Sequence, residues 1–591
     1  MNDRSDRMIT LETLIVAVLL AAGIGLRIAR LTWPPLAPLE AAAALEAARS
    51  TWAASALDPS TGPAQEPAYA AVTALLFTAF GATDALARAV PAAAGIALLA
   101  LPLLLRRRMG APSAVLAVLL LGLSPALVMI SRTAGGDAVA ITALSFCVAL
   151  LLRDDLPART RTAWIAGLLA LALASGPSGL IGLLGLALGF VIHRVLFRTA
   201  DGAWLELRSL PWSPRRELAV FVALLAVFAT AVGTRLDGIA GLAVSLEAWI
   251  KGWMYYGDLS LGPALVGWLV YEPLALAGGA YAAVVLWAKT KVNPSLVAWA
   301  LGAFLVMMIY PGRSAGELAW CVVPLALLAG QAMEEVAERM ARAEHKPILF
   351  ALIGLLLLLV VFAYLQLSAY ARGIGLGASF DPALRLGLAI GALALGLVIA
   401  VLFGLGWSWA LPAHAVSVVV SVVLLAQTVS AGWSLNHSAL AATARELWRP
   451  RAATVETHLL LETVRGVSLG QTGTEDDLPL RLEDAASPVL AWTFRLFPLD
   501  VPQGARVTDQ PRVILRRVDG QERALAADYM GQTFSISERK AWTGILPSGL
   551  LHWLVLRDAS TTPEQWLVLV RADVASFGEM PAQSVPDEAG G

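Results

Sequence analysis

The sequence predicts a polytopic α-helical membrane protein of about thirteen transmembrane helices, followed by a C-terminal soluble domain of β or mixed α/β structure. The chain of 591 residues is 58% hydrophobic and only 15% charged, whereas soluble domains carry about 25% charged residues. Its mean hydropathy is +0.70. Apolar runs near the length that spans a bilayer, roughly 20 residues, recur between residues 11 and 430, and none follows Trp433. The chain therefore divides into an apolar body and a water-facing tail.

Each span is predicted from its own apolar run. The first run, 11–30, ends in Arg27 and Arg30 and lacks a small-residue cleavage site, so it predicts an uncleaved anchor rather than a signal peptide. The hydropathy of the remaining runs predicts further spans at 88–105, 113–130, 138–152, 163–174, 178–197, 218–234, 263–287, 295–310, 318–333, 347–367, 383–403 and 408–430.

The basic residues predict the orientation. With the N-terminus in the cytoplasm, the inner loops hold the triplet Arg106–Arg108 and the basic clusters near 153–161, 194–216, 289–291 and 339–346. The outer loops then hold mostly isolated basic residues, as the positive-inside rule requires. This alternation holds only if the apolar segment 67–81 does not cross, so it is predicted as an interfacial or re-entrant helix. The tail is then extracytoplasmic and the protein lies in the plasma membrane.

Two domains follow from this division: a transmembrane domain over 1–433, with long outer loops at 31–87 and 235–262, and a soluble domain over 434–591. The first loop contains a predicted helix at 39–55. Short β-rich runs in the tail predict strands at 487–497, 511–518, 550–557 and 565–572. Long loops are where function is expected, because a helical bundle does not need them.

Several functional classes are excluded by composition and motif. The net charge of −1 argues against nucleic-acid binding. The two cysteines, Cys147 and Cys321, lie in apolar runs, which argues against disulfides and a cysteine zinc site. No GxxxxGK[ST] phosphate loop occurs. Charges inside the predicted spans are rare, which argues against an ion-coupled transporter. The six histidines are scattered and never at ligand spacing.

Two carboxylates are predicted at the outer membrane face. Glu40 begins the first-loop helix, and Asp137 lies between two spans, at the start of the second. Either could act in catalysis. The structural alternatives are that Glu40 is a solvated residue favoured by the helix dipole, and that Asp137 is an N-cap. Spacing alone does not show that the two loops meet.

Three segments resemble the membrane-embedded, lipid-phosphate-sugar-dependent glycosyltransferases of the GT-C fold. These segments are RLTWPPLAPLEAAAALEAARS (30–50), the run from ARAVPAAAGIALLALPLLLRRRMG (87–110) to LSPALVMISRTAGGDAVAITALSF (123–146), and YPGRSAGELAWCVVPLALLAGQAMEEV (310–336). The group includes protein O-mannosyltransferases and the aminoarabinose transferase of lipid A (family 39 type). YYGDLSLGPALVGWLVYEPLALAGG (255–279) and SPVLAWTFRLFP (487–498) look closest to the flippase-associated archaeal and bacterial branch.

The resemblance implies roles for individual residues. Glu40 falls on the Glu of the family's first-loop acidic pair, whereas Leu39 occupies the position of its Asp, the implied catalytic base. Asp137 falls on the second-loop acid. Arg313 falls on the basic residue that would face the lipid phosphate, and Arg132 on the arginine of the Ser-Arg pair before Asp137.

Other side chains of the outer face have a structural alternative as well. Arg313 could instead be a snorkelling interfacial residue. Tyr255 and Tyr256 in the second long loop could stack on a sugar, or belong to the aromatic belt of the membrane interface.

By this resemblance the chain is expected to transfer a sugar from a polyprenyl-phosphate donor to a protein, lipid or glycan acceptor of the cell envelope, with inversion. Glu40 or Asp137 would be the base, and Arg313 would bind the donor phosphate. No cofactor is expected, although a divalent metal ion held by Glu40 and Asp137 is an alternative. Leu39 favours a different function, that of a non-catalytic GT-C-like protein that helps to flip or present lipid-linked sugars.

Overall fold

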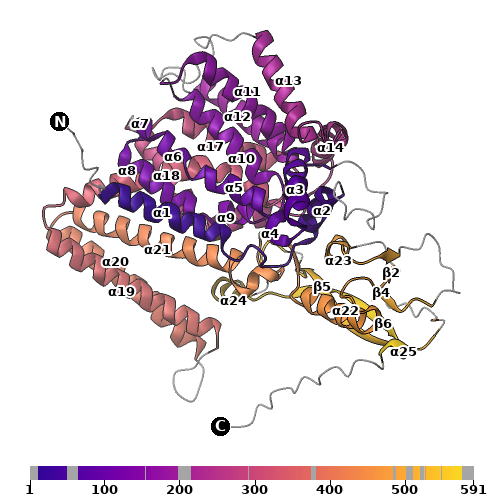
Figure 1. The fold of residues 1–591 in the computed structure, drawn as a ribbon. Helices are drawn as coiled ribbons and strands as arrows, with labels where there is room; N and C mark the ends of the chain where they lie inside the picture. The colour runs from indigo at the N-terminus through magenta and orange to yellow at the C-terminus, as the bar shows by residue number, and fades with distance from the viewer. Residues whose placement is uncertain are drawn as a thin grey trace, which may run out of the picture.

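The computed structural model describes residues 11–49, 64–153, 155–196, 214–289, 292–373, 381–483, 487–500, 510–518, 525, 527–542, 544–547 and 549–575. Up to residue 436 the described chain is a bundle of helices (Figure 1). A six-stranded sheet with its own helices follows.

Proline marks the beginning of many of the helices, because its fixed φ suits the first turn and its missing N–H is not needed there. The bundle comprises α1 (Leu11–Ile28), α5 (Ala89–Leu98), α6 (Leu101–Leu104), α7 (Arg106–Met109), α8 (Ala111–Leu123), α9 (Pro125–Ser131), α10 (Asp137–Leu151), α11 (Ala158–Ala174), α12 (Pro177–Leu196), α13 (Pro214–Thr230), α15 (Leu261–Tyr271), α16 (Pro273–Tyr281), η2 (Ala282–Leu286), α17 (Pro294–Ile309), η3 (Gly316–Leu318), α18 (Ala319–Ala341), α19 (Lys346–Ala371), α20 (Pro382–Gly406) and α21 (Ala410–Asn436).

Every span predicted from hydropathy overlaps one of these helices or a consecutive pair. Among the described residues, six helices are long and apolar enough to cross a membrane, and two bent pairs, α8 with α9 and α15 with α16–η2, raise the number to eight. The bends, 59° and 87°, fall at Pro125 and Pro273, whose rings interrupt the helical hydrogen bonds. The multi-pass helical body is confirmed. The count of thirteen stays a prediction, because several of the apolar helices are shorter.

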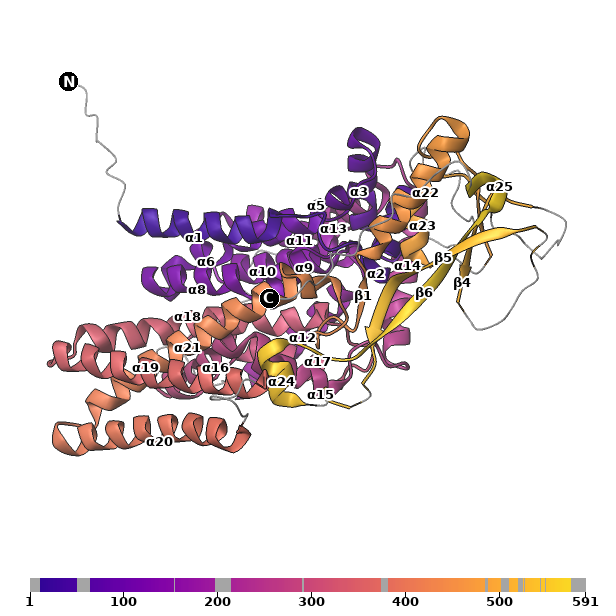
Figure 2. The same ribbon diagram turned by 90° about the horizontal axis from the view of Figure 1, so that it is seen from below.

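The two predicted outer loops are helical and lie at one end of the bundle. The first holds α2 (Pro38–Ala48), α3 (Pro67–Phe80) and α4 (Asp84–Ala87), and the second holds α14 (Asp237–Gly252). The predicted helix 39–55 is seen as far as α2 reaches, and residues 50–63 are outside the described part. In Figure 1, α7 lies at the left end of the bundle, and α2, α3 and α14 at the right. Figure 2 shows the sheet at that same right-hand end.

The C-terminal domain is mixed α/β. Its strands are β1 (Arg451–Ala453), β2 (Leu480–Leu482), β3 (Leu499–Asp500), β4 (Val513–Arg517), β5 (Tyr529–Lys540) and β6 (Thr561–Arg571), in the order β1-β5-β6-β4-β2-β3. Strands β1, β5, β6 and β4 pair antiparallel, and β4, β2 and β3 pair parallel. Its helices are η4 (Ala439–Ala442), α22 (Glu456–Thr472), α23 (Pro488–Thr493), α24 (Leu550–Leu556) and α25 (Ala572–Ala575). Side chains of α22, α23, β4, β5 and β6 form its core.

The structure corrects two of the four strand predictions. Residues 511–518 and 565–572 do form β4 and β6, but 487–497 holds α23 and 550–557 holds α24. Short apolar runs cannot be assigned by periodicity alone. In both segments the packing of one tryptophan favours the helix over a strand. Trp492 of α23 and Trp553 of α24 are almost fully buried against the end of the bundle.

The tail contacts the first loop directly. Trp492 donates its indole N–H to Asp84 Oδ1 of α4 at 2.7 Å and packs on Phe77 of α3, with ring centroids 5.8 Å apart. Arg495 donates to the Ala82 carbonyl at 2.7 Å. Trp492 also shares a buried cluster with side chains of α2 and α3. The first loop therefore folds as a layer between bundle and tail.

Candidate active site

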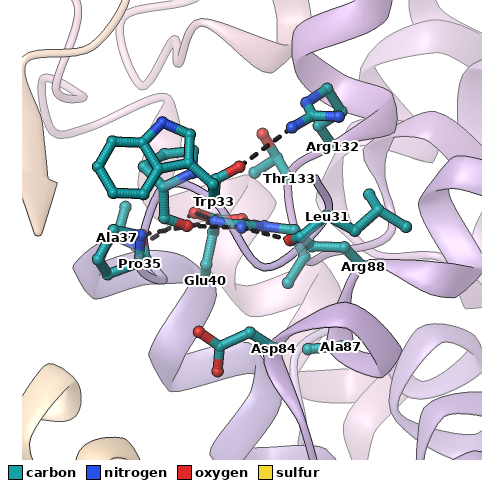
Figure 3. A network of polar contacts seen from close by, with 12 residues as sticks. Leu31, Trp33, Pro35, Ala37, Glu40, Asp84, Ala87, Arg88, Arg132 and Thr133 are labelled. Carbon is teal, nitrogen blue, oxygen red and sulfur yellow. Dashed lines mark hydrogen bonds and ion pairs between the residues drawn. The ribbon is translucent and has the colours of Figure 1, made fainter. Parts of the chain in front are cut away.

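Glu40 lies in the first turn of α2 and is buried in an ion pair with Arg88, which lies between α4 and α5 (Figure 3). Its Oε1 accepts from Arg88 Nε and from the Ala134 N–H, both at 2.9 Å. Its Oε2 accepts from Arg88 Nη2 at 2.9 Å and from the Ala37 N–H at 3.0 Å. A fork-to-fork pair with two added amide donors is a strong and geometrically specific arrangement. Glu40 therefore joins three segments: the start of α2, Arg88, and the turn before α10.

The charge state of Glu40 follows from these contacts. Burial acts to raise the pKa of Glu40, but the charge and hydrogen bonds of Arg88, with smaller effects from Arg449 and the Ala134 amide, hold it below its usual value. The carboxylate is thus ionised, with donors at both oxygens. A base needs a lone pair directed at the proton it removes, so these contacts suit a positioning role.

Two arginines hold the chain between α1 and α2. Arg88 Nη1 donates to the carbonyls of Leu31 and Pro34 at 2.8 and 2.7 Å. Arg132 donates to the carbonyls of Ala29 and Trp33 at 2.5 and 3.0 Å, and so satisfies acceptors left open at the end of α1. Figure 3 shows the two guanidinium groups approaching this segment. The structure thus places Arg132 on protein carbonyls.

Asp137 and Glu66 form a second acidic neighbourhood. Asp137 is the first residue of α10 and Gly136 its N-cap, so the N-cap alternative for Asp137 is wrong by one position. The side chain of Ser178 lies close enough to Asp137 to favour its ionised form. Glu66, just before α3, accepts from the Gly136 N–H at 2.9 Å. Both acids therefore lie next to Gly136, Glu66 as the acceptor of its N–H and Asp137 as the following residue.

Two glycines make room for this neighbourhood. A Cβ at Gly136 would overlap the Ser175 carbonyl, and a Cβ at Gly316 would overlap the Asp137 carboxylate. The turn before α10 is thus in close contact with the turn before α12 and with η3. Such close approach of backbones requires glycine.

The electrostatics of this pair differ from those of Glu40. Burial, and then the charge of Asp137, raise the pKa of Glu66 well above its ordinary value. Within the described residues, no ion pair joins a basic side chain to either acid. Two carboxyl groups without a cation share a proton more readily than they both ionise. The pair is therefore poised to accept or release a proton.

Arg313 and Glu317 extend this site towards the bundle interior. Glu317 accepts from the Ser314 N–H and is close enough to Asp137 and Arg313 to interact electrostatically with both. Arg313 donates to the carbonyls of Met307 and Met308 at the end of α17, both at 3.1 Å.

A narrow cavity begins at these two side chains. It runs between α12, α17 and α18, and its other lining residues are mostly apolar: Ile181, Gly182, Gly185, Trp299, Ala303, Val306, Met307, Tyr310 and Trp320. Two charged side chains thus adjoin a mostly apolar cavity of about 10 Å³, room for about one water molecule.

Tyr255 and Tyr256 follow α14 and lie beside the Arg313 turn. Backbone hydrogen bonds join Gly312 N–H to the Gly252 carbonyl at 2.7 Å and Gly257 N–H to the Pro311 carbonyl at 3.1 Å. Tyr256 interacts electrostatically with Arg313. Both tyrosines are largely exposed, at 67% and 88%. Their exposure fits a substrate-facing role and a membrane-interface role equally.

The predicted residues therefore fall into two groups. Asp137, Arg313 and the two tyrosines belong to one neighbourhood, and Glu40 and Arg132 belong to a structural network around Arg88. Sequence reasoning did not single out Arg88, Glu66 or Glu317. Arg88 and Glu317 lie inside segments that carried the family resemblance, and Glu66 directly precedes Pro67 at a helix start.

A shared metal ion does not fit the two expected ligands, since both carboxylate oxygens of Glu40 already accept hydrogen bonds from Arg88. Across the described residues there is also no group of three or more His, Cys, Asp or Glu side chains that could hold a metal ion.

Comparison with solved structures identifies the architecture. The aminoarabinose transferase ArnT from Cupriavidus metallidurans, bound to undecaprenyl phosphate, matches 82% of this chain and 84% of its own, with a TM-score of 0.51 and 18% identity. The chain has the GT-C fold. The apo form of ArnT gives a TM-score of 0.49. The oligosaccharyltransferase of Archaeoglobus fulgidus gives 0.39 at 13% identity, over 82% of this chain and 64% of that one.

No family model and no curated protein matches the sequence. The GT-C fold and the membrane-capable helices together make the chain a multi-pass membrane protein. The helical membrane body, the C-terminal sheet domain and the GT-C fold are confirmed, whereas the count of thirteen spans stays a prediction.

Proposed function

We propose that this GT-C-fold protein is a membrane glycosyltransferase that transfers a sugar from a polyprenyl-phosphate donor to a hydroxyl acceptor. The supporting observation is the half-buried acid pair Glu66–Asp137, which lies next to Glu317, Arg313 and a narrow, mostly apolar cavity. ArnT, which shares the fold, is bound to undecaprenyl phosphate. A proton acceptor, a phosphate-binding cation and an apolar groove are the three parts that such a transfer needs.

In the proposed reaction the acceptor oxygen attacks the anomeric carbon and the carbon–oxygen bond to the lipid phosphate breaks. The acceptor proton passes to Asp137, with Glu66 tuning that carboxyl group. Arg313 stabilises the departing phosphate, and Tyr256 contributes beside it. A single displacement inverts the configuration at the anomeric carbon. Glu40, through Arg88 and the Ala134 amide, positions the turn that carries Asp137.

We also propose that this site faces the outer side of the plasma membrane. Helices α2, α3 and α14 and the C-terminal domain lie at one end of the bundle (Figures 1 and 2), and the basic helix α7 lies at the other (Figure 1). An enzyme tag that is active only outside the cytoplasm, fused to the C-terminus, should be active. An inactive tag would show that the C-terminus lies in the cytoplasm and that the proposed orientation is wrong.

The function is tested with purified protein, radiolabelled polyprenyl-phosphate sugars and protein, lipid and glycan acceptors. Asp137→Asn should reduce transfer by about 10² or more, the usual contribution of a positioned base. Arg313→Gln should also reduce transfer. Glu247→Gln, which removes an exposed acid of α14, is the matched control and should transfer normally. Full transfer by both Asp137→Asn and Glu66→Gln would remove the assignment of these acids.

A second candidate is a non-catalytic protein of this fold that flips or presents lipid-linked sugars. It is favoured by Leu39, which occupies the position of the family's acid and is 64% exposed, and by the full set of donors around Glu40. If the wild-type protein binds polyprenyl phosphate but transfers sugar to no acceptor, while loss of the gene still alters surface glycans, this candidate replaces the first.

A further inference from the structure

A second cavity lies at the opposite end of the bundle from the candidate active site. Its volume is about 400 Å³. It is lined by Leu103 and Leu104 of α6, by the three arginines of α7, and by Leu152, Arg153 and Asp155 after α10. It therefore has an apolar wall and a basic rim, and none of the residues assigned to the candidate active site lines it.

The described lining of the rim is mostly basic. Four arginines face one carboxylate among the described lining residues. Asp155 is shared between Arg153 at 2.5 Å and Arg107 at 3.5 Å, and the Arg107 side chain is 86% exposed. The long pair of exposed Arg107 is weak, so an anion that enters the cavity can compete for the Arg107 guanidinium group.

The cavity also adjoins an exposed apolar surface. Arg106 pairs with Glu12 of α1 at 2.7 Å, which ties the rim to the first turn of that helix. Leu11, next to Glu12, and Ile15, one turn later, are 73% and 42% exposed. An amphiphile with its head at the rim could therefore lay its chains against α1.

We propose that this cavity binds the anionic headgroup of a phospholipid of the leaflet at that end. The guanidinium forks of α7 hold the phosphate oxygens, a geometry that arginine matches well, and the leucines and α1 contact the acyl chains. Basic pockets between helices are typical sites for anionic headgroups. The bound lipid would link α1, α6–α7 and the end of α10. This inference rests on the cavity and is independent of the proposed function.

The test is native mass spectrometry of the full chain in detergent, after incubation with phosphatidylglycerol or with phosphatidylcholine of the same acyl chains. The wild type should retain phosphatidylglycerol preferentially. The double substitution R107Q/R108Q should lower that retention by about tenfold, because each arginine near the headgroup adds to binding. R215Q/R216Q, at the exposed start of α13, removes an equal charge elsewhere and should leave retention unchanged.

Three outcomes overturn the proposal. Equal retention of the two lipids, or equal loss in both double variants, would show that no lipid site exists at α7. Complete displacement of phosphatidylglycerol by inorganic phosphate would show a simple phosphate site without acyl-chain contacts. If R107Q/R108Q fails to fold, the single substitution R107Q, at an exposed position, is tested instead. Phosphatidylglycerol retention by R107Q equal to that of the wild type would also overturn the proposal.

Discussion

Two carboxylate neighbourhoods lie at the same end of this protein, and their surroundings are opposite. Glu40 is buried with a guanidinium and two backbone amides at its oxygens. Glu66 is half-buried, receives one backbone amide and faces Asp137, a second acid. Burial alone raises the pKa of both glutamates, and only Glu40 has a cation to reverse that effect.

The difference separates structure from chemistry. A carboxylate with all its acceptors occupied holds segments together and has nothing left for a substrate. An acid pair without a cation is unfavourable for folding, and this kind of electrostatic strain is typical of functional sites. The family resemblance pointed to Glu40 and Asp137 as equivalent acids, and the contacts make them unequal.

The largest expected effect is on stability at Glu40. Glu40→Gln should reduce the free energy of unfolding by about 3–5 kcal/mol, because it leaves the Arg88 guanidinium buried without its counter-charge. Thermal unfolding in detergent measures this. Glu338→Gln, which removes an exposed pair with Arg342, is the control and should cost less than about 1 kcal/mol. If Glu40→Gln is as stable as that control, the Glu40–Arg88 ion pair does not contribute to the free energy of unfolding.

The same pair predicts how stability depends on pH. The pKa of Glu40 is lower in the folded protein than in the unfolded chain, so its contribution is present above the unfolded pKa and is lost as the pH falls through the folded one. Below pH of about 4.5 the wild type should therefore lose stability faster than Glu40→Gln. Parallel acid-unfolding curves for the two proteins would contradict this.

Glu66 should respond in the opposite direction. Its pKa is raised in the folded protein, so its ionisation at higher pH disfavours folding. Glu66→Gln keeps the acceptor for the Gly136 amide and removes the charge, so the melting temperature at pH 8 should rise. Sugar transfer by Glu66→Gln should fall. In this variant the decline of transfer with falling pH should also begin at a lower pH than in the wild type, because the Glu66 charge no longer disfavours ionisation of Asp137. A lower melting temperature for Glu66→Gln than for the wild type would show that Glu66, like Glu40, stabilises the fold.

The smallest effect is expected where the tail meets the first loop. Trp492→Phe removes the indole N–H that binds Asp84 and should cost about 1 kcal/mol, the typical value of one hydrogen bond. Limited proteolysis should then release the C-terminal domain faster, while transfer changes little. Trp409→Phe, at an exposed tryptophan before α21, is the control and should be digested as wild type. Equal digestion of both variants would leave the contact without a role in docking.

Hydropathy and charge alone determined much of the fold. Every apolar run predicted as a span overlaps a helix, and the tail is a separate mixed α/β domain. These features depend on local composition, which a sequence displays directly. The segments 487–497 and 550–557 failed because short apolar runs fit either a helix or a strand, and packing of Trp492 and Trp553 decided between them.

The site depended on tertiary structure. The sequence by itself predicted acids and arginines at one membrane face. Asp137 and Arg313, which were named through the family resemblance, lie near each other through Glu317 in the folded chain, and their roles in transfer stay a proposal. The sequence could not show that Glu40 meets Arg88, because they lie near opposite ends of the first loop, or that Glu66 meets Asp137, because these lie in different loops. Only the folded chain sets those distances. Away from water, the nearest charge decides whether a carboxylate holds segments of the chain together or can accept a proton.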